Sequence, residues 1–421
     1  MIKVFLGSWA LLLGMLFLML GNGIQGTLLG IRGEIEGFST FEMSIIMSAY
    51  FGGFMGGSRL APGMIRRVGH VRVFAALASF ISAVLILYPV LPNVVAWTIG
   101  RAIIGFCFSG VYVTAESWLN NSATNETRGQ TLSLYMLVQT LGIVAAQGVM
   151  ALGDPSTYVL FVVSSVLVSV SFAPILLSVS PTPAFETTKP LSLVALFNIS
   201  PLGCAGMFLL GGLFSAQFGM SAVYGAGLGL SLNEISIFVS SFFIGALIVQ
   251  YPLGWLSDRM DRRILILAVS IIGMFGAIMG MVLGGQFLTL LAASFVIGGM
   301  TNPLYSLLLA YTNDFLDHDD MAAASGGMVF ISGLGAIAGP VLTGAIMARI
   351  GASGFFLFIG TLFAMLAAYA AYRMTQRPAV PIGDTDSYAP IMMSSSPVAV
   401  EVAQEIAIEI AIEEDEHATA T

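Results

Sequence analysis

Two ionisable side chains, Arg101 and Glu116, lie inside a single apolar run of the sequence, residues 94–117. If the run is a helix that rises about 1.5 Å per residue, Arg101 lies roughly 10 Å below the membrane surface. A charged side chain at that depth is costly, and it indicates a functional site by default. We therefore expect the Arg101 side chain to couple transport to a substrate or a proton. The alternative is that it forms a structural bridge between helices.

Glu116 is the second ionisable group of this run. It lies about 22 Å further along the same helix, so the two charges cannot pair directly. Its neighbours Trp118 and Asn120 indicate the end of the span. This position favours an interfacial or gating role over a central proton site, and both stay open.

Uncharged polar side chains within other apolar runs are further candidates. Asn22 and Gln25 are three residues apart, so they share one face of a helix. In lipid they would be costly, so they must face protein or a cavity. Gln217, Asn302 and Tyr305 have comparable positions in later runs. Cavity lining and hydrogen bonding between helices both explain such residues.

Several kinds of chemistry are excluded by residues that the sequence does not contain. The chain has no Gly-Lys dipeptide and therefore no phosphate-binding P-loop. It also has no His-Glu-x-x-His, and His70, His318 and His417 are expected in solvated loops or the tail. Cys107 and Cys204 lie in apolar runs and are expected to be buried thiols. We expect no cofactor, no metal, no nucleic-acid partner and no enzymatic activity.

The elements that must position these residues are membrane helices. Apolar residues make up 57% of the 421 residues and charged residues only 9%, too few to cover a soluble protein. Twelve helices of about 21 residues use about 250 residues, which leaves enough for short loops. The runs are 4–29, 41–61, 73–91, 94–117, 129–151, 157–179, 199–222, 235–256, 264–283, 287–311, 321–348 and 353–373.

The positions of the basic residues predict the orientation. With the amino terminus inside, only Arg32 and Arg349 fall on the outer side. Basic residues favour the cytoplasmic side, so both termini are expected there. The inner side holds Lys3, Arg59, Arg66, Arg67, Arg72, Arg128, Lys189, Arg259, Arg262, Arg263, Arg373 and Arg377.

Prolines between residues 178 and 190 divide the runs six and six, which suggests an internal duplication. At an offset of 193, the first half matches the second at several positions. The pairs are Tyr112 with Tyr305, Asn120 with Asn313, Glu126 with Asp319, and Gly142 with Gly335. Near that offset, Arg66-Arg67 matches Arg262-Arg263. We therefore expect a bundle over 1–179, a linker over 180–198 and a second bundle over 199–373.

The loop after the eighth run carries the most specific motif. It reads Gly254-Trp-Leu-Ser-Asp258-Arg259-Met-Asp261-Arg262-Arg263. This pattern resembles the signature of the major facilitator superfamily, in which a glycine, an Asp-Arg pair and a basic pair follow one another. The resemblance implies a cytoplasmic gate formed by Gly254, Asp258, Arg259, Arg262, Arg263, Arg66 and Arg67, with Asp258 facing the start of the fifth helix. In the first half, Ala61 replaces the expected aspartate.

Longer stretches are similar to one branch of that superfamily, the YcaD-like bacterial transporters. They include Gly21-Asn-Gly-Ile-Gln-Gly-Thr, Ala115-Glu-Ser-Trp-Leu-Asn, Asn125-Glu-Thr-Arg-Gly, Pro303-Leu-Tyr-Ser and, in the tail, Ser396-Pro-Val-Ala. The resemblance implies an all-α fold of twelve transmembrane helices, in two pseudo-symmetric six-helix bundles around a central cavity.

The resemblance also assigns the polar candidates. In the superfamily, helices one, four, seven and ten line the cavity, which fits Asn22, Gln25, Arg101, Tyr112, Glu116, Gln217, Asn302 and Tyr305. Arg101 with Gly105 is similar to an Arg-x-x-x-Gly element linked to proton coupling in antiporters. Gly339-Pro340 is similar to a glycine-proline element that many drug–proton antiporters carry in the fifth helix, but here it lies in the eleventh run, where close packing and a hinge also explain it.

The tail, residues 374–421, differs from the rest. It contains Arg377 against nine acidic residues, so it holds the whole net charge of −8. Its proline- and serine-rich first part predicts disorder. The regular spacing of Glu401, Glu405, Glu409 and Glu413 permits a short amphipathic helix. A solvated tail is favoured over a docking element.

These features predict a secondary transporter for a small organic solute in the bacterial inner membrane, working by alternating access and coupled to protons as efflux antiport or uptake symport. We expect a monomer in the bilayer. A non-transporting sensor is the alternative, with an intramembrane enzyme less favoured. A channel fits poorly, because the polar positions are discontinuous.

Overall fold

Helices account for almost all of the computed structural model, which describes residues 2–123, 125–177, 192–316, 318–381, 385 and 388–406. The first half contains α1 (Ile2–Ile35), α2 (Thr40–Val68), α3 (His70–Val90), α4 (Val94–Ser122), α5 (Asn125–Ala151), α6 (Val159–Ser171) and α7 (Ala173–Leu177). The second half contains α8 (Leu193–Ile199), α9 (Pro201–Gly227), α10 (Leu232–Ser257), α11 (Arg262–Leu283), α12 (Phe287–Asn313), α13 (His318–Ile350) and α14 (Gly354–Met374).

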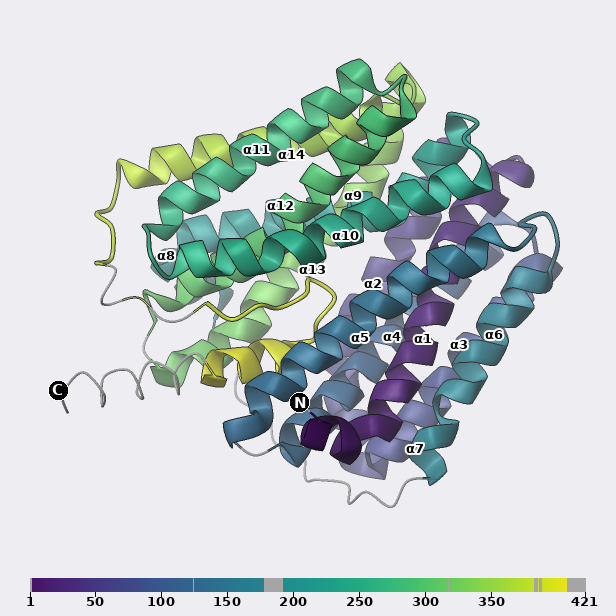
Figure 1. Cartoon of the computed structure of the whole chain (residues 1–421), viewed down its shortest axis with the longest axis horizontal. Helices are drawn as coiled ribbons and strands as arrows, with labels where there is room; N and C mark the ends of the chain where they lie inside the picture. Colours follow the sequence, from purple (N-terminus) through teal and green to yellow (C-terminus); the bar gives the residue numbers. More distant parts are fainter. Residues whose placement is uncertain are drawn as a thin grey trace.

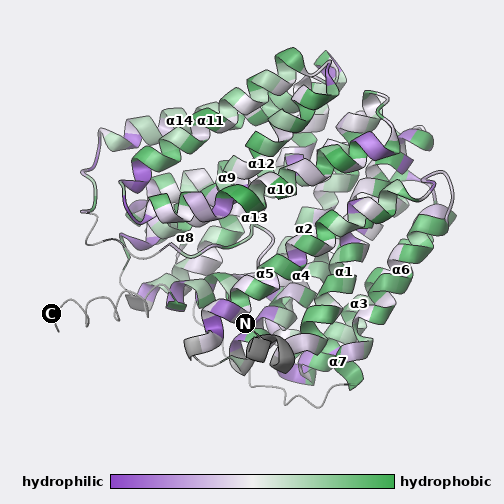
Figure 2. Ribbon diagram, in the orientation of Figure 1, coloured by the Kyte–Doolittle hydropathy of each residue, from purple (hydrophilic) through white to green (hydrophobic). Residues whose placement is uncertain are grey.

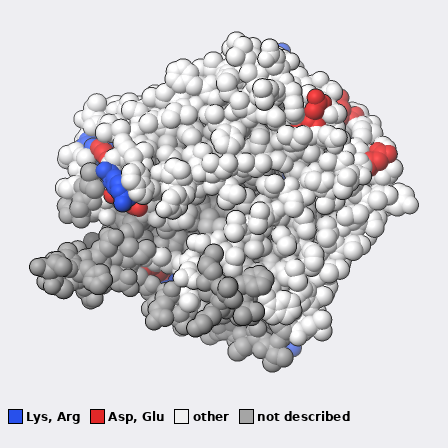
Figure 3. Space-filling model, in the orientation of Figure 1, with Lys and Arg blue, Asp and Glu red and all other residues white. Residues whose placement is uncertain are grey.

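All twelve expected apolar runs are present as helices, and α6 and α7 together form the sixth. Within the described residues, eleven are long and apolar enough to cross a membrane. The remaining one, α2, is 29 residues long but contains several glycines, serines and arginines. Figure 2 shows apolar residues along the helices, and Figure 3 shows charged side chains near the two ends, with an uncharged band between them.

The two halves pack in the same way. Neighbouring pairs in the first half are α1 with α5, α2 with α4, and α3 with α6. In the second half the equivalent pairs are α9 with α13, α10 with α12, and α11 with α14. Figure 1 shows the resulting bundles side by side. The fold is therefore the expected pair of pseudo-symmetric bundles.

Close packing within each bundle depends on glycine at equivalent positions. A Cβ added to Gly53 of α2 would clash with the Ala102 carbonyl of α4. A Cβ added to Gly245 of α10 would clash in the same way with the Phe295 carbonyl of α12. Glycine thus lets the backbones of the two helices touch.

The residues that begin equivalent helices in the two bundles are also alike. Ser39 and Glu42 form a capping box before α2, and Ser231 and Glu234 form one before α10. Each box satisfies amide groups that have no partner inside the helix. The same local chemistry therefore begins the second helix of each bundle. The structure does not describe the side chains of the expected matched pair Glu126 and Asp319, nor that of His318, which was expected in a loop.

One end of the molecule is called the arginine-rich end below. It holds the end of α2 with Arg66 and Arg67, the start of α5 with Arg128, and the α10–α11 loop with Arg259. Arg32 and Arg349 lie in the last turns of α1 and α13, at the opposite end. Lys3, Lys189, Glu409, Glu413, His417 and most of the expected linker fall outside the described residues or side chains.

The tail differs from the solvated chain that the sequence favours. Residues 388–406, called the tail segment below, return to the arginine-rich end and run between the two bundles (Figure 1). Residues 397–406 are helical, and Val400 and Ala403 are fully buried. The physical reason is that the aliphatic face of this acidic helix finds an apolar surface on the bundles.

Candidate functional site

A cavity of about 450 Å³ lies where the two bundles meet. Its walls come from α1, α2, α4 and α5 of the first bundle and from α8, α9, α10, α12 and α13 of the second half, with the tail segment added. Most lining side chains are apolar or aromatic. The described polar and charged ones are Asn22, Tyr50, Ser58, Arg59, Tyr112, Asn302, Ser332 and Ser394.

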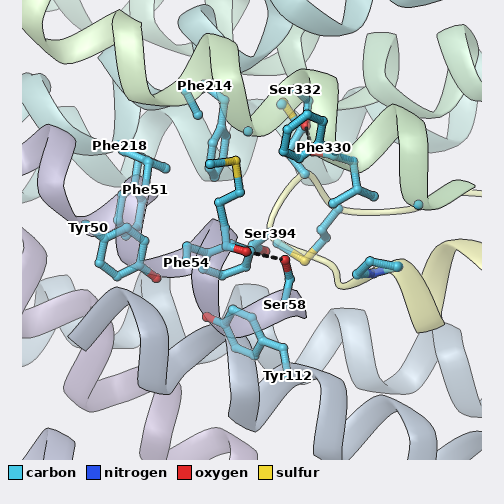
Figure 4. A pocket seen from close by; sticks show the side chains of 18 of the residues that line it. Tyr50, Phe51, Phe54, Ser58, Tyr112, Phe214, Phe218, Phe330, Ser332 and Ser394 are labelled. Carbon is cyan, nitrogen blue, oxygen red and sulfur yellow. Dashed lines mark hydrogen bonds between the residues drawn. The ribbon is translucent and has the colours of Figure 1, made fainter. Parts of the chain in front are cut away.

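An aromatic cluster joins the bundles at one wall of the cavity. The rings of Tyr50 and Phe51 of α2 lie 5.8 and 6.3 Å from the ring of Phe218 of α9. Phe214 stacks on Phe218 with centroids 5.8 Å apart. Figure 4 shows these rings together on one side of the cavity, with Tyr112 and Ser58 on another. Flat ring faces of this kind offer stacking surfaces to a planar solute.

Past the aromatic cluster, away from the arginine-rich end, the bundles are in direct contact. A Cβ on Gly30 of α1 would lie 2.8 Å from the Ala222 Cβ of α9. Ser48 of α2 donates a 2.5 Å hydrogen bond to the Ile337 carbonyl of α13. These contacts close the cavity on that side.

A chain of hydrogen bonds leads from the cavity wall to Arg101. Asn22 donates to the Tyr112 hydroxyl at 3.3 Å, and both residues line the cavity. Gln25 donates to Asn22 at 3.1 Å and accepts from Arg101 Nη1 at 2.8 Å. Four of the five polar residues that the sequence assigned to helices one and four therefore form one network, and Glu116 is the one outside it.

Arg101 itself lies behind the wall. Its side chain is fully buried, and its guanidinium lies 4.8 Å from the Tyr50 ring centroid and 3.3 Å from Met47 Sδ. Among the described residues it pairs with no carboxylate, and its Nε has no hydrogen-bond partner. Aromatic and amide groups therefore balance this charge in place of an anion.

Glu116 is placed away from the cavity, towards the arginine-rich end of α4. Its carboxylate is buried and accepts from the Tyr135 hydroxyl at 3.2 Å and from the Ser396 amide at 3.0 Å. The second donor belongs to the tail segment. Glu116 therefore does not line the cavity, and its partner in the tail segment was not predicted.

Of the three candidate residues in the second bundle, one lines the cavity and two do not. Asn302 lines the cavity, and its Oδ1 has no partner among the described residues. Gln217 donates to Thr301 Oγ1 at 2.6 Å and therefore ties α9 to α12. Tyr305, at the position equivalent to Tyr112, is fully buried but is not among the lining residues. Of the eight predicted residues, only Asn22, Tyr112 and Asn302 line the cavity.

The predicted gate loop is built around buried arginines. Arg262 contacts Asp314 and donates to the Ala310 carbonyl at 3.2 Å, so it holds the loop against the end of α12. Arg263 pairs with Asp261 at 2.7 Å and donates to the Arg377 carbonyl at 2.6 Å. Arg259 lies 4.4 Å from the Trp255 ring centroid. Arg66 and Arg67 are exposed at the end of α2.

Asp258 and Gly254 contact a segment that the motif did not indicate. Asp258 accepts from the Tyr388 amide at 2.8 Å, where the expected partner was the start of α5. A Cβ on Gly254 would lie 2.7 Å from the Tyr388 ring. Burial raises the pKa of the Tyr388 phenol above its usual range, so the hydroxyl stays protonated. It donates to the Pro303 carbonyl at 3.4 Å.

His70 also departs from its prediction. The sequence places it in a solvated loop, but it begins α3 and is buried, with Nε2 at 3.0 Å from Ser117 Oγ. The preceding Gly69, at φ 84°, makes the turn between α2 and α3 so short that the next residue is already in the helix.

Several aromatic residues line the cavity that the polar candidates do not include. Phe51, Phe54, Phe214, Phe218 and Phe330 face the cavity (Figure 4). The four-residue spacing of Phe214 and Phe218 is visible in the sequence, but lipid-facing helices contain similar pairs. Periodicity alone does not separate a cavity from lipid.

Comparison with known proteins agrees with this architecture. Residues 17–189 match the sugar (and other) transporter family, and residues 202–389 match the Major Facilitator Superfamily. The MFS-type transporter YcaD of Escherichia fergusonii is 24% identical over 356 residues, which cover 84% of this chain and 92% of YcaD. An MFS-type transporter of Yersinia pseudotuberculosis is 25% identical over 361 residues, which cover 85% and 93% of the two chains.

Solved structures share the fold at low sequence identity. The nucleoside transporter NupG superposes with a TM-score of 0.69 and 15% identity, covering 88% of this chain and 98% of NupG. A bacterial homologue of the human lysosomal transporter Spinster, in an inward-facing state, has a TM-score of 0.67 and 13% identity, covering 96% and 98%. Family models of transporters thus match both halves of the chain, and its duplicated bundles and gate motif make it similar to the transporters of the major facilitator superfamily, YcaD-like transporters among them.

Proposed function

We propose that this protein carries a small organic solute across the bacterial inner membrane by alternating access. The observation that supports this most directly is the cavity of about 450 Å³ between the bundles, closed on one side by α1–α9 and α2–α13 contacts. Ligand cavities commonly measure about 300–1,000 Å³. A site shared by two rocking bundles is what alternating access requires.

The lining favours a planar, neutral or anionic solute. Phe51, Phe214 and Phe218 offer ring faces, whereas Asn22 and Asn302 offer amide groups for hydrogen bonds. Among the described lining residues, Arg59 is the charged one, and its guanidinium lies 4.2 Å from the Phe330 ring centroid. No described lining residue is acidic, so a cationic solute would meet no carboxylate and would be repelled by Arg59.

Coupling is assigned to the network behind the wall. A solute that binds Asn22 competes for its bond with Gln25, which in turn is bonded to Arg101. Occupancy of the cavity therefore changes the contacts of a buried charge. Proton coupling would use this link, and both termini would lie in the cytoplasm of a monomeric protein. Reporter fusions at either terminus test this orientation, and a periplasmic signal from either one would contradict it.

A binding screen followed by flux measurements tests the function. The purified protein is screened by thermal shift against metabolites, drugs and nucleosides, because a ligand of the native state raises Tm by mass action. Hits are then assayed for uptake into proteoliposomes. Asn302→Ala should abolish both the shift and the flux, whereas Gln286→Ala, outside the cavity before α12, should leave both unchanged. A compound that binds Asn302→Ala as tightly as the wild type would show that its binding site is not this cavity.

A further inference from the structure

The tail segment closes the arginine-rich end of the cavity. Met392, Met393, Ser394 and Pro397 are among the residues that line it. Figure 4 shows Ser394 among side chains of both bundles. Since direct helix contacts already close the other side, the tail segment bounds the side on which it lies between Glu116 of α4 and Ser306 of α12.

Bonds to the second bundle fix the start and the end of the segment. The Tyr388 amide donates to Asp258 at 2.8 Å, and the Ile391 amide donates to Ser306 Oγ at 2.8 Å. Further along, Gln404 Nε2 donates to Asn313 Oδ1 at 3.0 Å. One point just after α10 and two points on α12 therefore hold the segment.

Bonds to the first bundle complete the bridge. The Ser396 amide donates to Glu116 at 3.0 Å, and Glu405 pairs with Arg128 at 2.7 Å. Ile406 also packs on α5, because a Cβ on Gly129 would lie 3.7 Å from Ile406 Cγ2. The segment thus bonds both bundles across the mouth of the cavity.

Burial shows that these contacts form a fitted interface. Ile391, Ser396, Val400 and Ala403 are 0–2% exposed. Gly254 adds a specific fit, since any Cβ there would press on the Tyr388 ring. A tail in loose contact with the surface would leave its serines and small aliphatic residues partly exposed.

We propose that the tail segment is a built-in plug, which occludes the cavity at the arginine-rich end and must undock before a solute can pass. The inference rests on the proposed function, because it assigns control of the same cavity. The plug inhibits in two ways. It fills the route between α4 and α12, and its bonds to both bundles oppose their relative motion at this end. Its covalent link gives it a high effective concentration, so inhibition needs no second molecule.

The test uses the full chain and a matched pair of substitutions in the same tail. Ala403→Asp places a carboxylate in the buried interface, which is unfavourable without a partner. Ala379→Asp makes the same change at an exposed position. Each is combined with Ser58→Cys, a reporter on the cavity wall, in a background in which the buried Cys107 and Cys204 are alanine. A charged maleimide is the probe.

Two readouts are compared in detergent. One is the rate at which the maleimide modifies Ser58→Cys. The other is the distance distribution between spin labels at Ile406 and at the exposed Thr375, which reports whether the segment is docked. We expect Ala403→Asp to broaden the distances and to speed modification about tenfold or more. Ala379→Asp should change neither readout.

Two results would overturn the plug. Broadened distances with an unchanged modification rate would mean that the docked segment does not obstruct the cavity. Unchanged distances in Ala403→Asp, with the protein still folded, would mean that the segment is a fixed part of the structure. Neither readout involves a transported solute, so failure of the proposed function would be recognised separately, as absent flux in Ala403→Asp after its plug has been shown to undock.

Discussion

The backbone amide of Ser396 donates a 3.0 Å hydrogen bond to the carboxylate of Glu116, although 280 positions separate the two residues. Glu116 is buried in α4, where the Tyr135 hydroxyl also donates to its carboxylate. A buried carboxylate is costly unless donors surround it. The tail segment therefore supplies a partner that the membrane helices alone do not provide.

Arg101 is expected to be necessary for transport and dispensable for insertion. Arg101→Ala should reduce flux to background, because Gln25 loses the partner at 2.8 Å that connects it to the buried charge. Arg101→Lys should restore little, since an ammonium cannot both reach Gln25 and lie flat against Tyr50. Flux into proteoliposomes is measured beside the elution profile of each variant. Wild-type flux in Arg101→Ala would remove the residue from coupling.

Packing of α2 on α4 should depend on one of two adjacent glycines. Gly53→Ala should lower stability by about 1–3 kcal/mol, because the new methyl group would clash with the Ala102 carbonyl. Gly52→Ala should be neutral or slightly stabilising, because its Cβ would meet nothing within 4 Å. Thermal unfolding in detergent compares the two variants. Equal losses would indicate that helix flexibility, not contact, is the reason for the glycines.

Gly254 should affect how tightly the tail segment docks. Gly254→Ala presses on the Tyr388 ring, which lies 2.7 Å from the added Cβ, and should cost about 1 kcal/mol of docking. Removing the ring as well, in Gly254→Ala with Tyr388→Ala, should make the glycine substitution harmless relative to Tyr388→Ala alone. The spin-label distances described above measure docking. Additive effects would show that Gly254 serves helix packing only.

The Arg128–Glu405 ion pair should contribute modestly to docking. Its side chains are 18% and 43% exposed, and pairs of this kind are worth about 0.2–1 kcal/mol. Glu405→Arg should weaken docking, and the swap Arg128→Glu with Glu405→Arg should recover part of the loss. High salt should shrink the difference between variants. If the swapped pair docks no better than Glu405→Arg, the 2.7 Å contact is not the source of the effect.

The sequence by itself determined the membrane class, the twelve long helices and the duplication. Those features depend on local composition and spacing, such as the long apolar runs and the matches between the two halves at an offset of 193. It also marked Asn22, Gln25, Arg101 and Tyr112, because polar groups in apolar runs need partners. The network they form in α1 and α4 is the direct result of that need.

Only the tertiary structure decided which of these residues reach the cavity and where the tail lies. Whether Phe218 faces lipid or a solute depends on how two bundles meet, and an apolar ring satisfies both environments equally. The tail was misjudged for a similar reason. Its acidic and aliphatic faces permit either solvation or docking, and the choice depends on whether a complementary surface exists elsewhere. Glu116, Asp258 and Arg128 form that surface from three different helices and loops, a juxtaposition that no spacing along the chain contains.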